Sequence, residues 1–541
     1  MKKFCDNYSL VVIAVIAVGL IMRLLFAYHA FYDPEELHRV RIANAETFSR
    51  FLFESKMDLT PFLDIFLLRF LCSIFDSEFA LRTCQIAISA VYLFVLYKVS
   101  WRMLNNRAGG AFVVAMAALS PLHVFYSGIV RYHNMNALFV LLSIYYFYKL
   151  LEDVDGYKSP LAYGVSTAAA MMTQYYTIYL IGAQLVYLVL FHSKRLSRLW
   201  PKLLMAFSAS FMAFLPFIRV FLFQMKKADS KSLEFLVLMK GFLSKDLFNL
   251  IDSIFGFILG DFYLIHGDGV VNRMLLFSAF FLFAAMIAIF IRMILKRKMP
   301  REILFSAIIL GIVLTLSYGL RDVSTAAISA KYFLPFVFLI YMIFAGLLLS
   351  LKDKATKIIL TAAVFAILIL AQANMISALM EKPTVATMAE SICEDIDENG
   401  GVVVFSSEIT GIPGVGIYYS YETPMEYFAE YAPCEAEVAL IDDGRYKGRT
   451  RLRQGKLRVI KIIPPGDDAA VRALFEEKER IWMFFYNQGR DPERYLKNEM
   501  PPTEAYRALS ALTDPSESIV FKVSPRRDYF LGGAYLFVKK K

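Results

Sequence analysis

Long apolar runs separated by short charged breaks constrain the fold of this 541-residue chain more than any other feature. The first run, 8–28, has about the 20 residues that a helix needs to cross a bilayer. It lacks a small-residue cleavage site, so we expect it to be retained as a helix. Because lipid offers no partner to backbone N–H and C=O groups, such runs must fold as helices. The further runs are 80–100, 108–126, 130–151, 161–174, 176–191, 203–223, 271–295, 303–320, 332–351 and 358–375.

We therefore predict a polytopic α-helical membrane protein with about 11 transmembrane helices. The chain is 58% hydrophobic and only 20% charged, and the charge becomes dense after Ala378. This shift predicts a transmembrane domain over 1–378 and a soluble α/β domain over 379–541. In the latter, the sequence pattern indicates helices at 467–478 and 503–512 and strands at 402–405, 438–441, 459–463, 519–523 and 535–538.

Basic residues in the short loops predict the orientation. Clusters of Lys and Arg follow the second, sixth, eighth and tenth runs, and short basic loops mark the cytoplasmic side of a membrane. With the N-terminus inside, an odd number of spans places the 379–541 domain outside. The net charge of +10 is explained by these loops, so we predict the lipid bilayer and no nucleic acid as a partner.

The cysteines form no CxxC or Cys/His cluster, which argues against a zinc or redox site. Cys393 and Cys434 both fall in the soluble domain and could pair in an oxidising compartment. The two large outside loops, 29–79 and 224–270, are rich in aromatic residues. We expect helices in them that lie at the membrane interface, including one at 61–75.

The strongest candidate for chemistry is an acidic segment just beyond the first run. Asp33, Glu35, Glu36 and His38 lie there at a membrane–water boundary. A carboxylate at that place could act as a general base or help to hold a divalent cation. The alternative is helix capping, with Asp33 as N-cap, Pro34 at N1 and Glu36 at the capping-box position. The two interpretations are compatible.

Polar segments follow at the outer ends of other runs. Arg131, with Tyr132 and His133, could clamp a phosphate, or could anchor the span at the interface. Gln174 and Tyr175 could line a sugar or headgroup pocket, or belong to an aromatic belt.

Two more segments lie in later loops. Asp268 could supply a metal ligand or a contact to the acceptor, and a plain loop with turn residues is the alternative. Lys331, with Tyr332, could meet a phosphate as a point charge, or could snorkel to the interface. Under the predicted orientation, all these segments lie on the outer face, which is typical of an extracytoplasmic active site.

These residues resemble the GT-C class of polyprenyl-phosphate-dependent glycosyltransferases, which includes protein O-mannosyltransferases, aminoarabinose transferases and oligosaccharyltransferase catalytic subunits. The acidic segment matches the family's motif after span one, although it reads Asp-Pro-Glu-Glu. The stretch from Ser120 to Tyr132 is similar to the family's Ser-Pro, Tyr-Ser and Arg-Tyr pattern. Lys331-Tyr332 resembles the Arg-Tyr that opens a late span, with Lys in place of Arg. The resemblance covers roughly 8–351.

The resemblance implies an inverting transfer of a sugar from a polyprenyl-phosphate donor to a hydroxyl of a protein, lipid or glycan acceptor. Asp33 and Glu36 would be catalytic, and Glu35 or Glu36 would bind the acceptor or a divalent cation, Mg²⁺ or Mn²⁺. Arg131 and Lys331 would stabilise the departing phosphate. The remaining substrate-binding candidates are His38, Tyr132, His133, Gln174, Tyr175, Asp268 and Tyr332.

Three alternatives stay open. An oligosaccharyltransferase-like enzyme is favoured by the spacing of Asp33, His38 and Arg41, although the tail lacks a Trp-Trp-Asp motif. A transporter or flippase of lipid-linked glycans would place its ionisable residues near mid-membrane and would often show internal repeats, which this chain lacks. A noncatalytic assembly factor is the third.

Overall fold

The computed structural model describes a large part of the chain, which it divides into two compact units. The membrane unit comprises Met1–Ala30 and Arg39–Leu379, and the sheet unit comprises Phe31–His38 and Met380–Lys541. The described residues are 7–29, 34–58, 61–75, 77–152, 156–227, 270–319, 330–379, 384–406, 434–441, 457–463, 468–477, 480–487 and 531–538.

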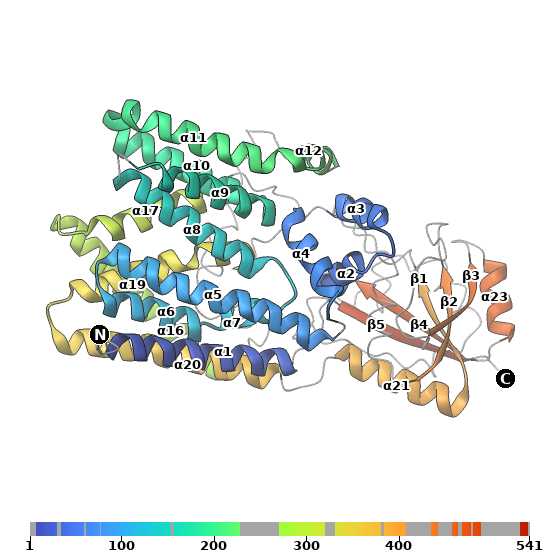
Figure 1. The fold of residues 1–541 in the computed structure, drawn as a ribbon. Helices are drawn as coiled ribbons and strands as arrows, with labels where there is room; N and C mark the ends of the chain where they lie inside the picture. The colour runs from blue at the N-terminus through green and yellow to red at the C-terminus, as the bar shows by residue number, and fades with distance from the viewer. Residues whose placement is uncertain are drawn as a thin grey trace, which may run out of the picture. The chain divides into compact units, whose positions relative to one another are not determined.

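Each predicted apolar run coincides with helical structure in the membrane unit (Figure 1). The polytopic α-helical membrane fold is thus confirmed. By length and composition, five described stretches could cross a membrane, or six if one bent pair is a single span, so the count of about eleven stays a prediction. The helices are α1 (Asn7–His29), α5 (Glu78–Leu104), α6 (Arg107–Leu119), α7 (Pro121–Gly128), α8 (His133–Glu152), α9 (Lys158–Thr173), α10 (Thr177–His192), α11 (Leu196–Phe214), α12 (Ile218–Lys227), α16 (Val270–Leu295), α17 (Arg301–Gly319), α18 (Ala330–Phe333), α19 (Val337–Ser350) and α20 (Lys354–Leu379).

The run 108–126, predicted as one span, is bent in the structure. The run is broken into α6 and α7, which meet at an angle of 59°. Ser120 is the N-cap of α7, and its hydroxyl accepts from the His123 amide, while Pro121 follows at the first helical position. Proline has no N–H to continue the α6 hydrogen-bond ladder, so the chain turns at this residue.

The described part of the first large loop, 29–79, contains three short helices, in agreement with the pattern of its apolar residues. They are α2 (Pro34–Ala43), α3 (Phe48–Met57) and α4 (Phe62–Cys72). Helix α2 begins at Pro34, where the capping interpretation places its start. The loop 224–270 is described only up to Lys227, and most of it lies outside the described residues.

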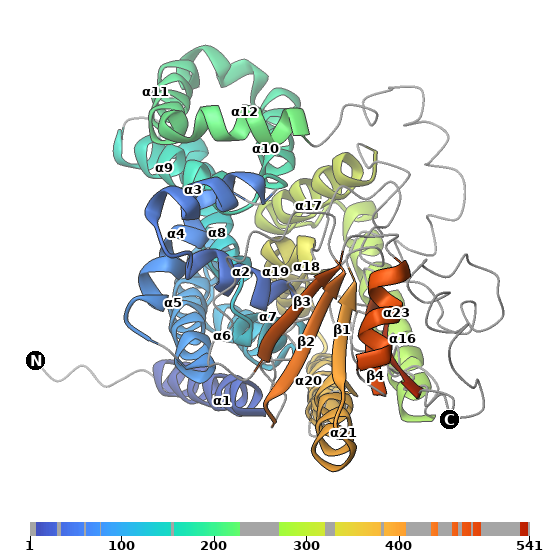
Figure 2. The same cartoon turned by 90° about the vertical axis from the view of Figure 1, so that its right-hand side faces the viewer.

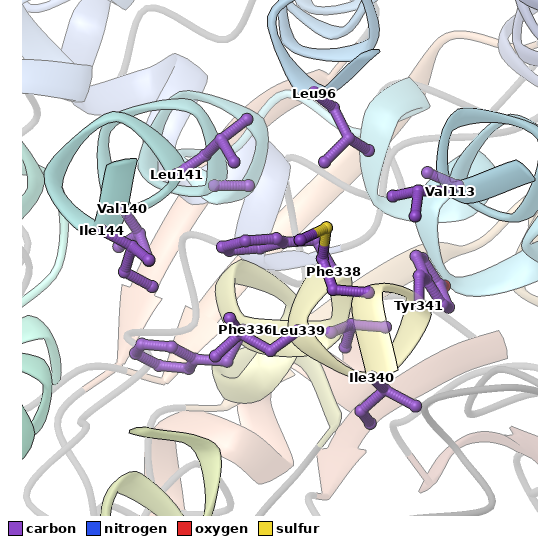
Figure 3. Packing of buried hydrophobic residues seen from close by; sticks show 14 of the residues in the cluster. Leu96, Val113, Val140, Leu141, Ile144, Phe336, Phe338, Leu339, Ile340 and Tyr341 are labelled. Atoms are coloured by element: carbon purple, nitrogen blue, oxygen red, sulfur yellow. The ribbon is translucent and has the colours of Figure 1, made fainter. Parts of the chain in front are cut away.

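Helix α19 is the centre of the hydrophobic core of the membrane unit. Its side chains are buried along almost its whole length, which is expected of a helix that is apolar on every side. Figure 3 shows Phe338 and Tyr341 of α19 among Leu96 of α5, Val113 of α6 and Leu141 of α8. The core therefore joins segments that are more than 200 positions apart in the sequence.

The sheet unit contains a five-stranded sheet in the order β3-β2-β1-β4-β5 (Figure 1), and Figure 2 shows β3, β2 and β1 side by side. Its first four strands run parallel and β5 is antiparallel at the edge. Helix α23 (Asp468–Glu477) links β3 to β4, as a parallel pair of strands requires. The strands are β1 (Val402–Ser406), β2 (Ala436–Ile441), β3 (Leu457–Ile463), β4 (Arg480–Asn487) and β5 (Leu531–Val538).

The sequence pattern thus located four of the five strands and missed two elements, β4 and the helix α21 (Thr384–Asn399). The predicted strand 519–523 and helix 503–512 lie outside the described residues. Cys393 in α21 forms a disulfide with Cys434, which lies two residues before β2. This bond fixes α21 to the sheet across 41 positions of sequence.

Close packing of α9 against α11 generates a test. A Cβ atom added to Gly164 would lie 2.3 Å from the backbone oxygen of Ala206, so Gly164→Ala must push the helices apart. We expect a loss of about 1–3 kcal/mol in the free energy of unfolding. Gly311→Ala in α17 is the matched control, because nothing lies within 4 Å of its added methyl group. Equal melting temperatures for the two variants in detergent would contradict the packing.

Candidate active site

The loop between α7 and α8 presents an arginine beside two aromatic rings. Arg131 donates its backbone N–H to the carbonyl of Ile129 at 2.9 Å, which closes a tight turn. Its guanidinium carbon lies 5.5 Å from the centre of the Tyr132 ring, and the His133 ring lies 4.5 Å from the same ring. All three side chains are buried. The fold thus holds a cation and an aromatic platform at the end of a span.

A second arginine approaches the same tyrosine from α2. The guanidinium carbon of Arg39 lies 5.7 Å from the Tyr132 ring centre. Burial raises the pKa of Tyr132, and the neighbouring Tyr332 raises it further. The positive charges of Arg131 and Arg39 lower it, but the effect of burial is larger. The Tyr132 phenol therefore keeps its proton and can donate a hydrogen bond.

Arg39 is held by two carboxylates. Its Nη2 lies 2.6 Å from Asp64 of α4 and its Nη1 lies 3.3 Å from Asp58, the C-cap of α3. Burial works against the charge of Arg39, but the attraction of Asp64 and Asp58 outweighs it and raises the pKa of the guanidinium. The three helices of the first loop are thus joined through a single cation.

The turn between α9 and α10 joins this network. The Tyr175 hydroxyl donates to the side-chain carbonyl of Gln224 at 2.5 Å. The Gln224 amide in turn donates to the backbone carbonyls of Ser55 and Asp58. Hydrogen bonds therefore run without a break from Tyr175 to the C-terminal end of α3, where Asp58 pairs with Arg39.

Gln174 and Tyr176 extend the same turn. The Asn136 amide of α8 donates to the side-chain oxygen of Gln174, and Thr173 donates to the Asn136 oxygen at 3.1 Å. The Tyr176 ring centre lies 4.9 Å from that of Tyr332. Tyrosines from two distant segments therefore make an aromatic wall next to the buried amide network.

The structure therefore brings several sequence-predicted residues together within the membrane unit, through the contacts given above. These residues are Arg131, Tyr132, His133, Gln174, Tyr175 and Tyr332.

The remaining predicted residues are not placed in this cluster. Asp33 and Asp268 lie outside the described residues, as do the side chains of Glu35 and Lys331. Glu36, which is buried, and His38, which is partly exposed, belong to the sheet unit. Their roles stay predictions.

Sequence reasoning missed the residues that hold the cluster in place: Arg39, Asp58, Asp64, Asn136 and Gln224. For Asp64 a signal exists, because it stands in the apolar helix α4. A carboxylate in such a segment needs a partner and so points to a buried pair. No comparable local signal marks Gln224, whose partners lie between 49 and 169 positions away.

No group of three or more His, Cys, Asp or Glu side chains able to hold a metal ion occurs in the part of the chain that the structure describes. The expected Mg²⁺ or Mn²⁺ therefore receives no ligand set from these residues.

The ion pair of Arg39 with Asp64 makes a testable prediction. Asp64→Asn leaves a buried cation without its nearest counterion, and we expect a loss of about 3–5 kcal/mol of stability. The double variant Arg39→Met/Asp64→Leu removes both charges and should lose less than Asp64→Asn alone. Glu54→Gln is the control, because Glu54 pairs with Arg50 within one helix, where the two side chains keep 17% and 25% of their surface exposed. It should cost about 0.3–0.5 kcal/mol. Thermal unfolding in detergent measures all three, and similar losses for Asp64→Asn and Glu54→Gln would refute the role of the pair.

Comparisons with known proteins relate this arrangement to a family. Residues 60–219 match the family model described as dolichyl-phosphate-mannose-protein mannosyltransferase. No curated protein matches the chain in the sequence comparison.

Two solved structures are similar over 97% of this chain and 97% of their own. They are ArnT from Cupriavidus metallidurans bound to undecaprenyl phosphate, with 13% identity and a TM-score of 0.52, and the same protein in the apo state, with 12% and 0.51. The fold expected from the motifs is thus confirmed. Residues 60–219 are thus similar to this mannosyltransferase family, and the chain as a whole shares its fold with the ArnT structures.

Proposed function

We propose that this protein transfers a sugar from a polyprenyl-phosphate donor to an acceptor hydroxyl on the extracytoplasmic side of the membrane. The observation that carries the proposal is the buried cluster of Arg131, Tyr132 and Arg39. Tyr132 lies within the segment that matches the mannosyltransferase family. The similar ArnT structure contains undecaprenyl phosphate, which supports a lipid-linked donor.

The leaving group of such a reaction is a lipid phosphate, so the site must stabilise negative charge. Arg39 is held by Asp58 and Asp64 and is therefore suited to fix Tyr132 in place. The guanidinium carbon of Arg131 lies over the face of the Tyr132 ring, 5.5 Å from its centre. We assign the phosphate to Arg131 and Lys331, with the protonated Tyr132 as an additional donor.

In the proposed reaction the acceptor O–H gives its proton to the carboxylate of Asp33. Glu36, three residues further along the chain, is the second catalytic carboxylate. The oxygen forms a bond to the anomeric carbon, and the bond from that carbon to the phosphate oxygen breaks. The electron pair leaves with the phosphate, and the configuration at the sugar carbon is inverted. Glu35, His38 and Asp268 would contact the acceptor. No step is assigned to a metal ion.

The sugar would lie between the phosphate group and the α9–α10 turn. Gln174 offers an amide held by Asn136, and Tyr175 and Tyr332 offer hydroxyls near aromatic faces. His133 supports the Tyr132 ring. Amide and phenol groups at the rim of an apolar site are suited to bind sugar hydroxyls.

The disulfide supports an extracytoplasmic position for the sheet unit. Disulfides between buried cysteines persist mainly in oxidising compartments. The bond between Cys393 and Cys434 agrees with the orientation that the basic loops predict.

Replacement of Asp33 tests the chemistry. Asp33→Asn removes the proton acceptor but keeps the side-chain size, and we expect transfer to fall by about 10²–10⁴-fold. The assay uses a panel of polyprenyl-phosphate sugars with hydroxyl acceptors of protein, lipid and glycan classes. Asp353→Asn is the control, because this exposed carboxylate caps α20 by accepting from the Thr356 amide and asparagine can do the same. Full activity of Asp33→Asn would refute its assignment.

Labelling of introduced cysteines tests the orientation. A membrane-impermeant maleimide applied to intact cells should label Glu477→Cys in α23, because we place the sheet unit outside. Lys298→Cys, in the basic loop after α16, should react only after lysis. Both positions are exposed, so access to the side chain does not differ. Labelling of Lys298→Cys but not Glu477→Cys in intact cells would reverse the orientation.

A further inference from the structure

Two buried arginines, Arg23 of α1 and Arg82 of α5, lie at the broken span formed by α6 and α7. Neither residue belongs to the candidate site, and both side chains are fully buried. We infer that these arginines are positioning residues. They keep α6 and α7 bent relative to each other and thereby fix the position of the loop 129–132, which carries Arg131 and Tyr132. The effect on transfer rests on the proposed function, whereas the effect on the break does not.

The contacts of Arg23 account for the carbonyls that the break releases. In a straight helix, the N–H groups of residues 121 and 122 would bond to the carbonyls of Ala117 and Ala118. Pro121 has no N–H, and the chain turns there. The guanidinium of Arg23 takes both acceptors, with Nη2 at 3.1 Å from the Ala117 oxygen and Nη1 at 2.9 Å from the Ala118 oxygen.

The same guanidinium reaches across the break. Its Nε lies 3.1 Å from the hydroxyl of Ser127 on α7 and 3.0 Å from that of Ser89 on α5. Ser127 donates in turn toward the Asn134 side-chain oxygen at 3.2 Å, at the start of α8. One side chain therefore connects α6, α7 and α8, the elements on both sides of the loop 129–132.

Arg82 does at the end of α7 what Arg23 does at the end of α6. Its Nη1 donates to the carbonyl of Gly128 at 2.6 Å, and Gly128 is the last residue of α7. Glu78, one turn earlier on α5, holds the guanidinium at 2.9 Å. Cations are favoured at helix C-termini because the final carbonyls carry partial negative charge. The carbonyls at the C-terminal ends of α6 and α7 thus each accept hydrogen bonds from an arginine of another helix.

The fixed loop has a direct consequence for the candidate site. Arg131 follows Gly128, the end of α7, by only three residues. Its backbone N–H closes a tight turn with Ile129, so the short connection from α7 to α8 cannot absorb a movement of α7. A shift of α7 must move Arg131 and Tyr132. Displacement of a catalytic group by about 1 Å can cost about 100-fold in rate.

The test compares Arg23→Met with Arg23→Met/Pro121→Ala. The single variant removes the guanidinium donors from the Ala117 and Ala118 carbonyls, so its melting temperature should fall. In the double variant, alanine at 121 restores the missing N–H, so α6 can continue and satisfy both carbonyls. We expect the melting temperature to recover while transfer stays about 100-fold below that of the wild type. Recovery of transfer together with stability would overturn the proposal, because a merely structural arginine behaves in that way.

A second measurement does not depend on activity. Backbone hydrogen exchange over 121–134 should be faster in Arg23→Met than in the wild-type chain, with no change in α10. Arg198→Met, at an exposed position on α11, is the matched control and should leave both segments unchanged. If Arg23→Met fails to fold, Arg23→Lys takes its place, because lysine keeps the charge but has one nitrogen where the guanidinium uses three to reach α6 and α7. If Arg23→Met exchanged its backbone hydrogens over 121–134 at the wild-type rate, the proposal would be refuted, whether or not the protein transfers a sugar.

Discussion

The guanidinium of Arg23 satisfies backbone carbonyls that neither lipid nor water could reach. In a membrane-embedded bundle, a break in a helix is tolerated only where other groups take over the lost hydrogen bonds. Arg23 does this for α6, and Arg82 does so for α7. The bend of 59° and everything that follows it, including the loop 129–132, depends on these contacts.

A second buried cation organises the short helices of the membrane unit. Arg39 joins α2, α3 and α4 through Asp58 and Asp64, and the Gln224 amide ties α3 to α12 and to Tyr175. A buried charge is costly unless it is paired, so these contacts select one arrangement of the short helices. Tyr132 lies beside both Arg39 and Arg131 and so connects this frame with the residues proposed to bind phosphate.

Sequence reasoning predicted the candidate site in part. Arg131, Tyr132 and Gln174 could be predicted because they stand at turns next to apolar runs, where a polar side chain indicates a specific role. Asn136 and Gln224 could not be predicted, because the sequence around a single amide within a helix does not tell whether that side chain is buried or exposed. The chemistry-bearing Asp33 lies outside the described residues, so its place in the site still rests on the family motif and on the proposed reaction.

By itself the sequence determined the helical membrane fold, the start of α2 at Pro34 and four of the strands in the sheet unit, because hydrophobic length, periodicity and capping are local properties. The tertiary structure alone decided that the run 108–126 is two helices, that Cys393 pairs with Cys434, and that Arg39 binds two carboxylates. The physical reason is that a buried charge, a freed carbonyl or a thiol finds its partner through space. The partners of Arg23 lie up to 104 positions away along the chain.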